Sequence, residues 1–578
     1  MTIRRRQFLA SPFLITPALS QARARPNVLL IMTDDQGYGD NAYNGNPLLR
    51  TPVLDRLASQ SVRFRRFYVS SVCAPTRASL LTGRYHLRTG VWGVTGGRET
   101  MRSEEVTIAE ALKAAGYRTG LVGKWHLGEH YPCVPHNQGF DEFTGFRLGH
   151  WNRYLDPPLE RNGKAFQAKG YISDVFTDEA IAFIDRSESE PFFLYLAYNA
   201  PHSPYIVPDR DYDRFEGKGL SVPVASTYAM VENLDRNLGR LLSHLDQTGL
   251  ADNTIVLFLC DNGPAGETRF NAGLRGKKAS VYEGGIRSPL WVRWPSVLKP
   301  KDVDGAAAHI DVYPTLLSLC KVSRPAGPAI DGVDLAAAMT GSEKIPERML
   351  FSHNAGNRER SPYPGAVRES RWSLINGKEL YDLAQDPGEQ KDVAATNPEV
   401  TSRLRKAYEQ WFNEAAEQCG FEQPAIPVGH AEENPVWLPA TRAEFGADLK
   451  YFGEHGYAHD WITGWSKASS VEWDVDVVRE GVYQVQVLYL SEPEGVGTLL
   501  TVQAGAKQAS ARIASATDNE PIPTGLRQVS PHYLEFRWKE LMLGEIALRQ
   551  AKQRLQLTAA GNQISGLRGV KRLVLRRV

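Results

Sequence analysis

The sequence has few cysteines, almost no net charge and no long apolar run. Five cysteines are scattered over 578 residues, too few for a disulfide framework, and no C-x-x-C pair suggests zinc. With 67 basic and 66 acidic residues the net charge is +1, so nothing in the composition favours a nucleic-acid partner. No stretch of about eighteen apolar residues is present that could span a membrane as a helix. What remains is ordinary globular composition, long enough for three or four folding units.

Residues 1–24 have the form of an export signal. Arg5 and Arg6 precede a short, moderately apolar stretch, and a small-x-small cleavage pattern ends at Ala24. The paired arginines are similar to a twin-arginine signal, which carries folded proteins across a bacterial membrane. The alternative is a disordered basic arm. We expect a mature chain that begins near Arg25 and is exported to the periplasm or outside the cell.

Two continuous apolar runs each end in a pair of oxygen-bearing side chains. They are residues 27–32, followed by Asp34 and Asp35, and residues 254–260, followed by Asp261 and Asn262. Such runs predict strands that are buried on both faces. If the strands are neighbours in a sheet, the four side chains can converge, and their hard oxygen ligands suit calcium or magnesium. Each pair by itself could equally form a turn or cap a helix.

Helix and strand patterns alternate between these two runs. Helical patterns cover residues 106–115, 174–186 and 227–244, and a strand pattern covers residues 191–198. The alternation favours an α/β fold with a mostly parallel sheet, and ligands bind beyond the carboxyl ends of such strands.

The pattern of predicted helices and strands changes twice along the chain. We expect the α/β domain over residues 25–345 and a smaller α+β subdomain, built from short strands and a helix, over residues 346–425. Prolines mark a predicted linker at residues 426–440. Alternating apolar residues between glycine-containing turns then predict an additional β-sandwich over residues 441–578.

The segment from Cys73 to Arg84 closely resembles the signature of the formylglycine-dependent type I sulfatases, which are arylsulfatase-like and have an alkaline-phosphatase-like fold. Cys73, Pro75 and Arg77 match the required positions, and Thr76 stands where many members have serine. Further motifs follow in the family's order, at residues 123–128, 139–143, 201–204, 261–263, 274–285, 309–315 and 379–383. The resemblance covers roughly residues 27–419 and leaves the predicted sandwich outside it.

The resemblance implies that Cys73 is oxidised to formylglycine by a formylglycine-generating maturation enzyme. From the residues alone, a single cysteine close to Arg77 and Arg84 could be a buried structural residue or a thiolate nucleophile. The family also implies one divalent cation, calcium in preference to magnesium. Its implied ligands are Asp34, Asp35, Cys73 (as formylglycine), Asp261 and Asn262.

The implied reaction releases inorganic sulfate from a sulfate monoester. One hydroxyl of the hydrated aldehyde attacks sulfur and the alcohol departs; the second hydroxyl then loses its proton, and sulfate leaves. By resemblance, Arg77 holds the diol, and Lys124 and Lys278 contact sulfate oxygens where charge develops. His126 serves the diol and His202 serves the leaving oxygen, since histidine titrates near neutral pH.

The expected substrate is a sulfated small molecule or glycan. Loops at residues 149–154 and 357–360 are either rim elements, in which aromatic rings stack on sugars and arginines pair with anions, or variable surface loops. As a rim, the first loop predicts a higher KM when Trp151 and Arg153 are replaced. The rival functions are a phosphate or phosphonate ester hydrolase of the same fold and an inactive glycan-binding pseudo-sulfatase.

The predicted sandwich resembles carbohydrate-binding modules in form only, which is a weak argument for binding. Trp461, Trp465 and Trp473 could form an exposed binding face or belong to the core. The sequence makes no prediction of the oligomeric state.

Overall fold

The computed structural model describes most of the chain after the predicted export signal. Residues 1–24 lie outside the described part, as do residues 357–359 of the second candidate rim loop. The described residues are 25–187, 190–354, 356, 360–446, 448–453, 455–457, 459–524, 526, 534–561 and 563–578. None of the helices in these ranges is long and apolar enough to cross a membrane.

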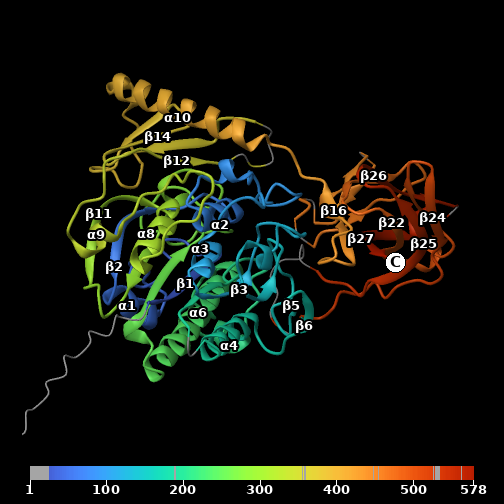
Figure 1. Ribbon diagram of the computed structural model, residues 1–578, viewed down its shortest axis with the longest axis horizontal. Coiled ribbons are helices and arrows are strands. Elements are labelled where there is room, and N and C mark those ends of the chain that lie inside the picture. The colour runs from blue at the N-terminus through green and yellow to red at the C-terminus, as the bar shows by residue number, and fades with distance from the viewer. Residues whose placement is uncertain are drawn as a thin grey trace, which may run out of the picture.

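A large, mostly parallel sheet forms the centre of the first domain (Figure 1). β1 (Asn27–Thr33) lies between β7 (Phe192–Ala197) and β8 (Thr254–Cys260) and is parallel to both. Every residue of these three strands is buried, which is why their sequences are continuously apolar. The predicted α/β class with a mostly parallel sheet is confirmed.

The strand order of this sheet is β11-β2-β10-β8-β1-β7-β3-β4-β5-β6, and β9 pairs with β2. The remaining strands are β2 (Val62–Tyr68), β3 (Arg118–Lys124), β4 (Glu142–Phe146), β5 (Pro158–Arg161), β6 (Lys164–Gln167), β9 (Arg287–Ser288), β10 (Leu290–Arg293) and β11 (Lys301–Ala308).

Helices cover both faces of the sheet. Alternate residues of β1 point to opposite faces, so Val28 and Leu30 enter one core with α2, α3 and α8, while Leu29 and Ile31 enter another with α1, α4 and α6. The helices are α1 (Pro52–Ser59), α2 (Cys73–Thr82), α3 (Ile108–Ala114), α4 (Ile172–Asp185), α5 (Asp209–Tyr212), α6 (Val222–Gln247), α7 (Glu283–Ile286), α8 (Val312–Cys320) and α9 (Ala336–Thr340).

The smaller subdomain follows as an antiparallel sheet packed against one long helix. α10 (Pro398–Cys419) contributes Leu404, Tyr408 and Phe412 to its core. The strands run in sequence order, β12 (Leu350–His353), β13 (Gly365–Arg368), β14 (Trp372–Ile375) and β15 (Glu379–Asp382).

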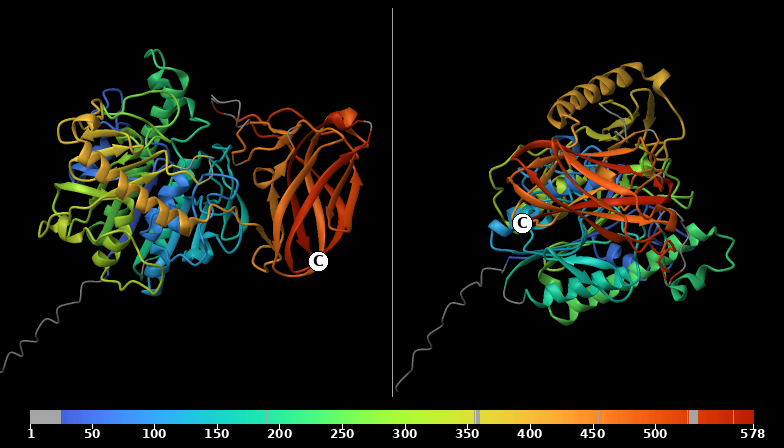
Figure 2. Two further views of the ribbon diagram at one scale, coloured as in Figure 1. Left: turned by 90° about the horizontal axis from the view of Figure 1, so that it is seen from above. Right: turned by 90° about the vertical axis from the view of Figure 1, so that its right-hand side faces the viewer.

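The rest of the chain is a β-sandwich that stands beside the α/β domain (Figure 2). One sheet has the order β16-β21-β26-β23-β24 with β18 on β21, and the other has the order β19-β20-β27-β22-β25 with β17 on β27. The strands are β16 (Ile426–Val428), β17 (Val436–Pro439), β18 (Glu444–Phe445), β19 (Lys450–Tyr451), β20 (Ile462–Thr463), β21 (Ser470–Val477), β22 (Gly481–Ser491), β23 (Leu499–Ala504), β24 (Lys507–Arg512), β25 (Lys539–Leu548), β26 (Ala551–Ala560) and β27 (Leu567–Arg577).

The segment at 426–440 is part of this sandwich and not the linker that its prolines predicted. β16 pairs with β21 and β17 pairs with β27, and Ile426 and Leu438 are buried in the shared core. Pro427 is tolerated because β16 is an edge strand, where a missing N–H costs no ladder hydrogen bond.

The three tryptophans that could have formed either an exposed binding face or part of the core belong to the interior of the sandwich. Trp461, Trp465 and Trp473 are 2%, 5% and 0% exposed. They therefore offer no open aromatic face to a carbohydrate.

Candidate active site

Cys73 lies where a helix begins and two strands end. It is the first residue of α2 and is buried. Its Sγ and carboxylate oxygens of Asp34 and Asp261 all lie within 4.8 Å of one another. Thr76 joins the start of α2 to the residue that follows β8. Its Oγ1 donates to the carbonyl of Asp261 (2.6 Å) and accepts from the N–H of Ser70 (2.9 Å).

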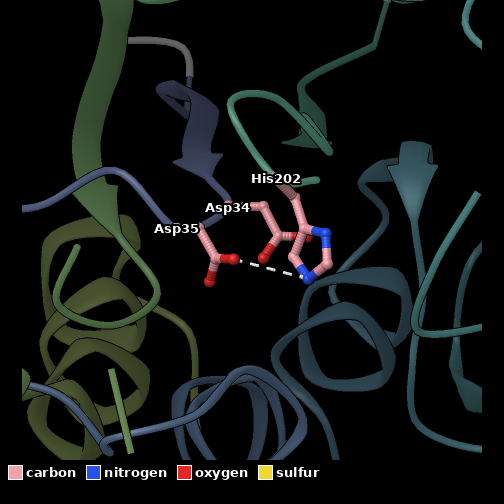
Figure 3. A group of neighbouring side chains, drawn as sticks. All are labelled: Asp34, Asp35 and His202. Carbon is pink, nitrogen blue, oxygen red and sulfur yellow. Dashed lines mark ion pairs between the residues drawn. The ribbon is translucent and has the colours of Figure 1, made fainter. Parts of the chain in front are cut away.

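The two polar pairs meet because β1 and β8 are neighbours in parallel register, with Thr33 beside Cys260. The N–H of Asp35 donates to Oδ1 of Asp261 at 3.0 Å, and Nδ2 of Asn262 donates to Oδ1 of Asp35 at 2.9 Å. All four side chains are buried. Figure 3 shows Asp34 and Asp35 beside the ring of His202, whose Nε2 lies 3.4 Å from Oδ2 of Asp35.

Three cationic side chains lie against these carboxylates. Burial disfavours their charge, and ion pairs with the carboxylates compensate for it. The ion pairs are Lys124 Nζ to Asp34 Oδ2 (2.6 Å), Lys278 Nζ to Asp35 Oδ1 (2.6 Å) and Arg77 to Asp261 Oδ2 (3.1 Å). Arg77 and Lys124 have no exposed side-chain surface, whereas the Lys278 side chain is 21% exposed. The open side of the cluster is therefore the side of Lys278.

The carboxylates differ in their electrostatics. Burial alone would raise the pKa of Asp34, but Lys124, His202 and Arg77 outweigh it and hold that pKa well below its usual range. Burial and the neighbouring charge of Asp34 raise the pKa of Asp261 to about 8, although Arg77 opposes both. Three carboxylates at one point thus repel one another, a strain that a bound cation would relieve.

The donor set fits a hard divalent cation. Oδ1 of Asp34 and Oδ1 of Asn262 are buried and have no hydrogen-bond partner among the described residues. Buried oxygens of this kind are normally satisfied. Carboxylate and amide oxygens are the ligands that calcium and magnesium prefer. The residues that would hold such an ion are Asp34, Asp35, Asp261 and Asn262.

His126 has a defined tautomer. Its Nε2 lies 2.8 Å from the carbonyl of Val94, which can only accept, so Nε2 carries the proton. Nδ1 is then an acceptor, and it is buried without a hydrogen-bond partner among the described residues. Burial and the charge of Lys124 hold the pKa of His126 well below its usual value, which keeps the ring neutral. This histidine can accept a proton at Nδ1.

His202 is oriented in the opposite sense. Its Nδ1 donates to the carbonyl of Ser203 at 2.8 Å, which leaves Nε2 pointing towards Asp35. Burial lowers the pKa of His202, and the charge of Asp35 partly restores it. The ring can therefore exchange a proton at Nε2, beside the carboxylate cluster.

The simple thiolate interpretation of Cys73 does not suit this environment. Burial raises the pKa of its thiol even though Lys124 and Lys278 act in the opposite direction. A nucleophilic cysteine needs the thiolate form, which a raised pKa disfavours.

Of the two candidate rim loops, the first touches the site through His150. The ring of His150 contacts the ring of His202 edge-on, with centroids 4.5 Å apart. Trp151 is half-buried and stacks on Phe146 at 4.9 Å, so it is a packing residue of this loop. Arg153 is half-buried and lines a cavity of about 140 Å³ against the sandwich.

Two contributions to the site were absent from the sequence-based prediction. Arg269 donates to Asp40 at 2.7 Å and to the carbonyl of Asp35 at 2.9 Å, and so holds the loop that follows β1. It stands in a polar loop with no motif to distinguish it. Tyr457 and His459 of the sandwich contact the loop of His150, a proximity that sequence patterns do not encode.

Comparison with known proteins covers the first two domains. Residues 26–322 match the family model Sulfatase, and residues 273–415 match N-sulphoglucosamine sulphohydrolase, C-terminal. Human arylsulfatase A is 32% identical over 460 residues, covering 68% of this chain and 89% of that protein. Pig N-acetylgalactosamine-6-sulfatase is 30% identical over 449 residues, covering 66% and 84%. The crystal structure of Ps i-CgsB in complex with k-i-k-neocarrahexaose has a TM-score of 0.64 at 30% identity and covers 69% of this chain and 95% of that one. Both family models end before the sandwich begins.

Proposed function

Since the chain belongs to the sulfatase family, we propose that it hydrolyses sulfate monoesters of carbohydrates through a formylglycine made from Cys73. The observation that carries this proposal is the convergence of Cys73, Asp34 and Asp261 within 4.8 Å, beside two lysines that can bind an anion. The carbohydrate part is supported by relatives, such as the pig protein, that are named for N-acetylgalactosamine-6-sulfate.

Hydrated formylglycine would supply a nucleophilic hydroxyl and a second ionisable hydroxyl, and a divalent cation on Asp34, Asp35, Asp261 and Asn262 would lower a hydroxyl pKa. We expect calcium, because an all-oxygen set with several carboxylates suits it. The surrounding side chains do the rest. Arg77 orients residue 73 and offsets the charge of Asp261. Lys124 and Lys278 attract the sulfate oxygens, where charge spreads as the ester bond breaks.

The two histidines divide the proton transfers. His126 takes a proton at its buried Nδ1, which has no hydrogen-bond partner among the described residues, and is held in that tautomer by Val94. His202, when protonated on both ring nitrogens beside the carboxylate of Asp35, gives a proton to the departing alcohol from Nε2, because its Nδ1 donates to the carbonyl of Ser203. A neutral His126 that accepts at Nδ1 and a protonated His202 that donates at Nε2 fit the two opposite proton transfers of the reaction.

Maturation and export are part of the proposal. We expect the maturation enzyme to act before folding is complete, because Cys73 is only 1% exposed in the folded chain. If residues 1–24 direct export of the folded protein, this modification occurs in the cytoplasm and the active enzyme reaches the periplasm or the exterior.

The mass of the tryptic peptide at residues 67–77 tests the nucleophile. A loss of about 18 Da relative to cysteine is expected, the difference between a thiol and an aldehyde side chain. Aryl sulfate turnover should exceed aryl phosphate turnover, should disappear on treatment with a chelator, and should return with added calcium. An unmodified thiol, in a host that matures other sulfatases, would overturn the proposal. A preference for aryl phosphate would favour the phosphate or phosphonate ester hydrolase.

A further inference from the structure

The C-terminal sandwich contacts His150, whose ring lies against His202 of the proposed catalytic pair. The loop between β19 and β20 carries Tyr457, whose ring stacks on His150 with centroids 5.1 Å apart and planes 15° apart. His150 in turn meets the ring of His202 edge-on at 4.5 Å. Three rings in contact therefore lead from the histidine proposed to protonate the leaving group to a residue of the sandwich.

The same loop also contacts the backbone of His150 and the side chain of Thr95. His459 Nε2 donates to the carbonyl of His150 at 3.1 Å, and its ring packs edge-on against Trp151 at 4.7 Å. Thr95 Oγ1 donates to the carbonyl of Gly456 at 3.1 Å. Thr95 follows Val94, whose carbonyl sets the tautomer of His126.

Contacts outside this loop hold the sandwich in place. Glu433 accepts a hydrogen bond from the N–H of Tyr131 at 2.8 Å and forms an ion pair with Arg147 at 3.1 Å. At the other side of the loop of His150, Asn152 donates to Glu535 at 3.5 Å. Tyr457 is thus held beside the site by a docked domain and not by an isolated loop.

Tyr457 has one ring face against His150 but is still 36% exposed. Its exposed surface is separated by the ring of His150 from His202, the histidine proposed to serve the leaving alcohol, and the ring of His455 contacts Tyr457 with centroids 5.4 Å apart. The apolar C–H face of a sugar ring packs on aromatic rings, and tyrosine combines such a surface with a polar tip. We propose that Tyr457 binds the sugar ring that carries the sulfate ester, which makes the sandwich part of the substrate site. This inference rests on the proposed function.

The test compares two substitutions of Tyr457 in the full-length enzyme with formylglycine verified at residue 73. Tyr457→Leu keeps apolar bulk against His150 but removes the aromatic face, whereas Tyr457→Phe keeps the face. With sulfated disaccharides, Tyr457→Leu should raise KM about tenfold at unchanged kcat, and Tyr457→Phe should match the wild type. With p-nitrophenyl sulfate, which carries no sugar, Tyr457→Leu should change kcat/KM much less than with the sulfated disaccharides.

Met542→Ala is the matched surface control. Met542 is 44% exposed on β25, a strand that Figure 1 shows on the side of the sandwich away from the α/β domain, and its loss should leave both substrates unaffected. Wild-type KM in Tyr457→Leu would overturn the inference and leave the proposed function standing. An equal fall of kcat on both substrates would also overturn it, since Tyr457 would then only position His150. If the matured wild type cleaves no sulfate ester, the proposed function itself fails.

Discussion

At the scale of single residues, we expect the two lysines of the site to have a double role. Lys124 and Lys278 each lie 2.6 Å from a carboxylate oxygen, of Asp34 and Asp35 respectively. A cation held by those carboxylates would compete for the same oxygens, so the ammonium groups would be available to a sulfate. We therefore expect cation binding and sulfate binding to be coupled through these shared carboxylates.

Lys278 and its neighbour Lys277 provide a matched pair of substitutions. Lys278→Met removes a charge that contacts Asp35 and faces the open side of the cluster, so kcat on an aryl sulfate should fall about 100-fold, as for loss of one anion-stabilising donor. Lys277 is exposed and donates to the carbonyl of Gly266, and Lys277→Met should keep wild-type kcat. Equal kcat values in the two variants would contradict the role of Lys278.

At the scale of elements, glycines let three central strands approach closely. Gly123 in β3 has φ +113°, and a Cβ there would lie 2.0 Å from the carbonyl oxygen of Ala197 in β7. On the other side, a Cβ on Gly145 in β4 would lie 1.8 Å from the carbonyl oxygen of Gly123. The position of Lys124, the next residue along β3, depends on this close packing.

Gly123→Ala should therefore damage both stability and activity. We expect a loss of about 3 kcal/mol in the free energy of unfolding, because β7 must move and the backbone is strained. Gly116→Ala is the control, since Gly116 has φ +84° but a Cβ there would meet nothing within 4 Å. Backbone strain alone should cost about 1 kcal/mol there. Denaturant titration compares the two; similar losses would show that the close contact with β7 is unimportant.

At the scale of the whole molecule, buried histidines join the first two domains. His86, in the short 3-10 helix η1 (His86–Thr89), stacks on His353 of β12 with centroids 6.0 Å apart. Burial lowers the pKa of His86 to about 4 and the pKa of His309 and of His353 to about 3. All three rings are therefore neutral in the folded protein at neutral pH.

These histidines predict acid sensitivity. In the unfolded chain they bind protons below about pH 6.5, whereas in the folded protein they do so only near pH 3 to 4, so stability falls as the pH drops between these values. Each contributes about 1.4 kcal/mol per pH unit in that window. His353→Gln should flatten the fall of Tm between pH 6 and pH 4, and His136→Gln, at a half-buried surface position, should not. Parallel pH profiles for His353→Gln and the wild type would contradict this origin.

Glu433 joins the sandwich to the α/β domain through Tyr131 and Arg147. Burial alone would raise the pKa of this carboxyl, but its contacts with His130 and Arg147 hold it below its usual range. Glu433→Ala leaves Arg147 and the N–H of Tyr131 without this partner, and we expect a cost of about 2 kcal/mol. Limited proteolysis near residues 420–432 should become faster, whereas Glu432→Ala, at the exposed neighbour, should behave as the wild type. Unchanged cleavage in Glu433→Ala would mean that other contacts hold the sandwich.

Local patterns in the sequence determined the elements and the chemistry of the site. Continuous apolar runs predicted β1 and β8 because strands buried on both faces can hold few polar side chains. The motif residues predicted a cysteine, carboxylates, lysines and histidines for one site, and the fold brings these side chains together. The sequence also predicted a terminal sandwich from its period of two, although prolines at 426–440 concealed its first two strands.

Only the tertiary structure decided which of these elements meet. Asp35 and Asp261 are 226 residues apart and come together through the pairing of β1 with β8. The tautomers of the two histidines depend on carbonyls supplied by the folded backbone, and Tyr457 reaches His150 because a separate domain docks there. The periodicity of apolar residues predicts whether a residue is buried. Any apolar partner can bury that residue, so its actual partner is decided only when the whole chain has folded.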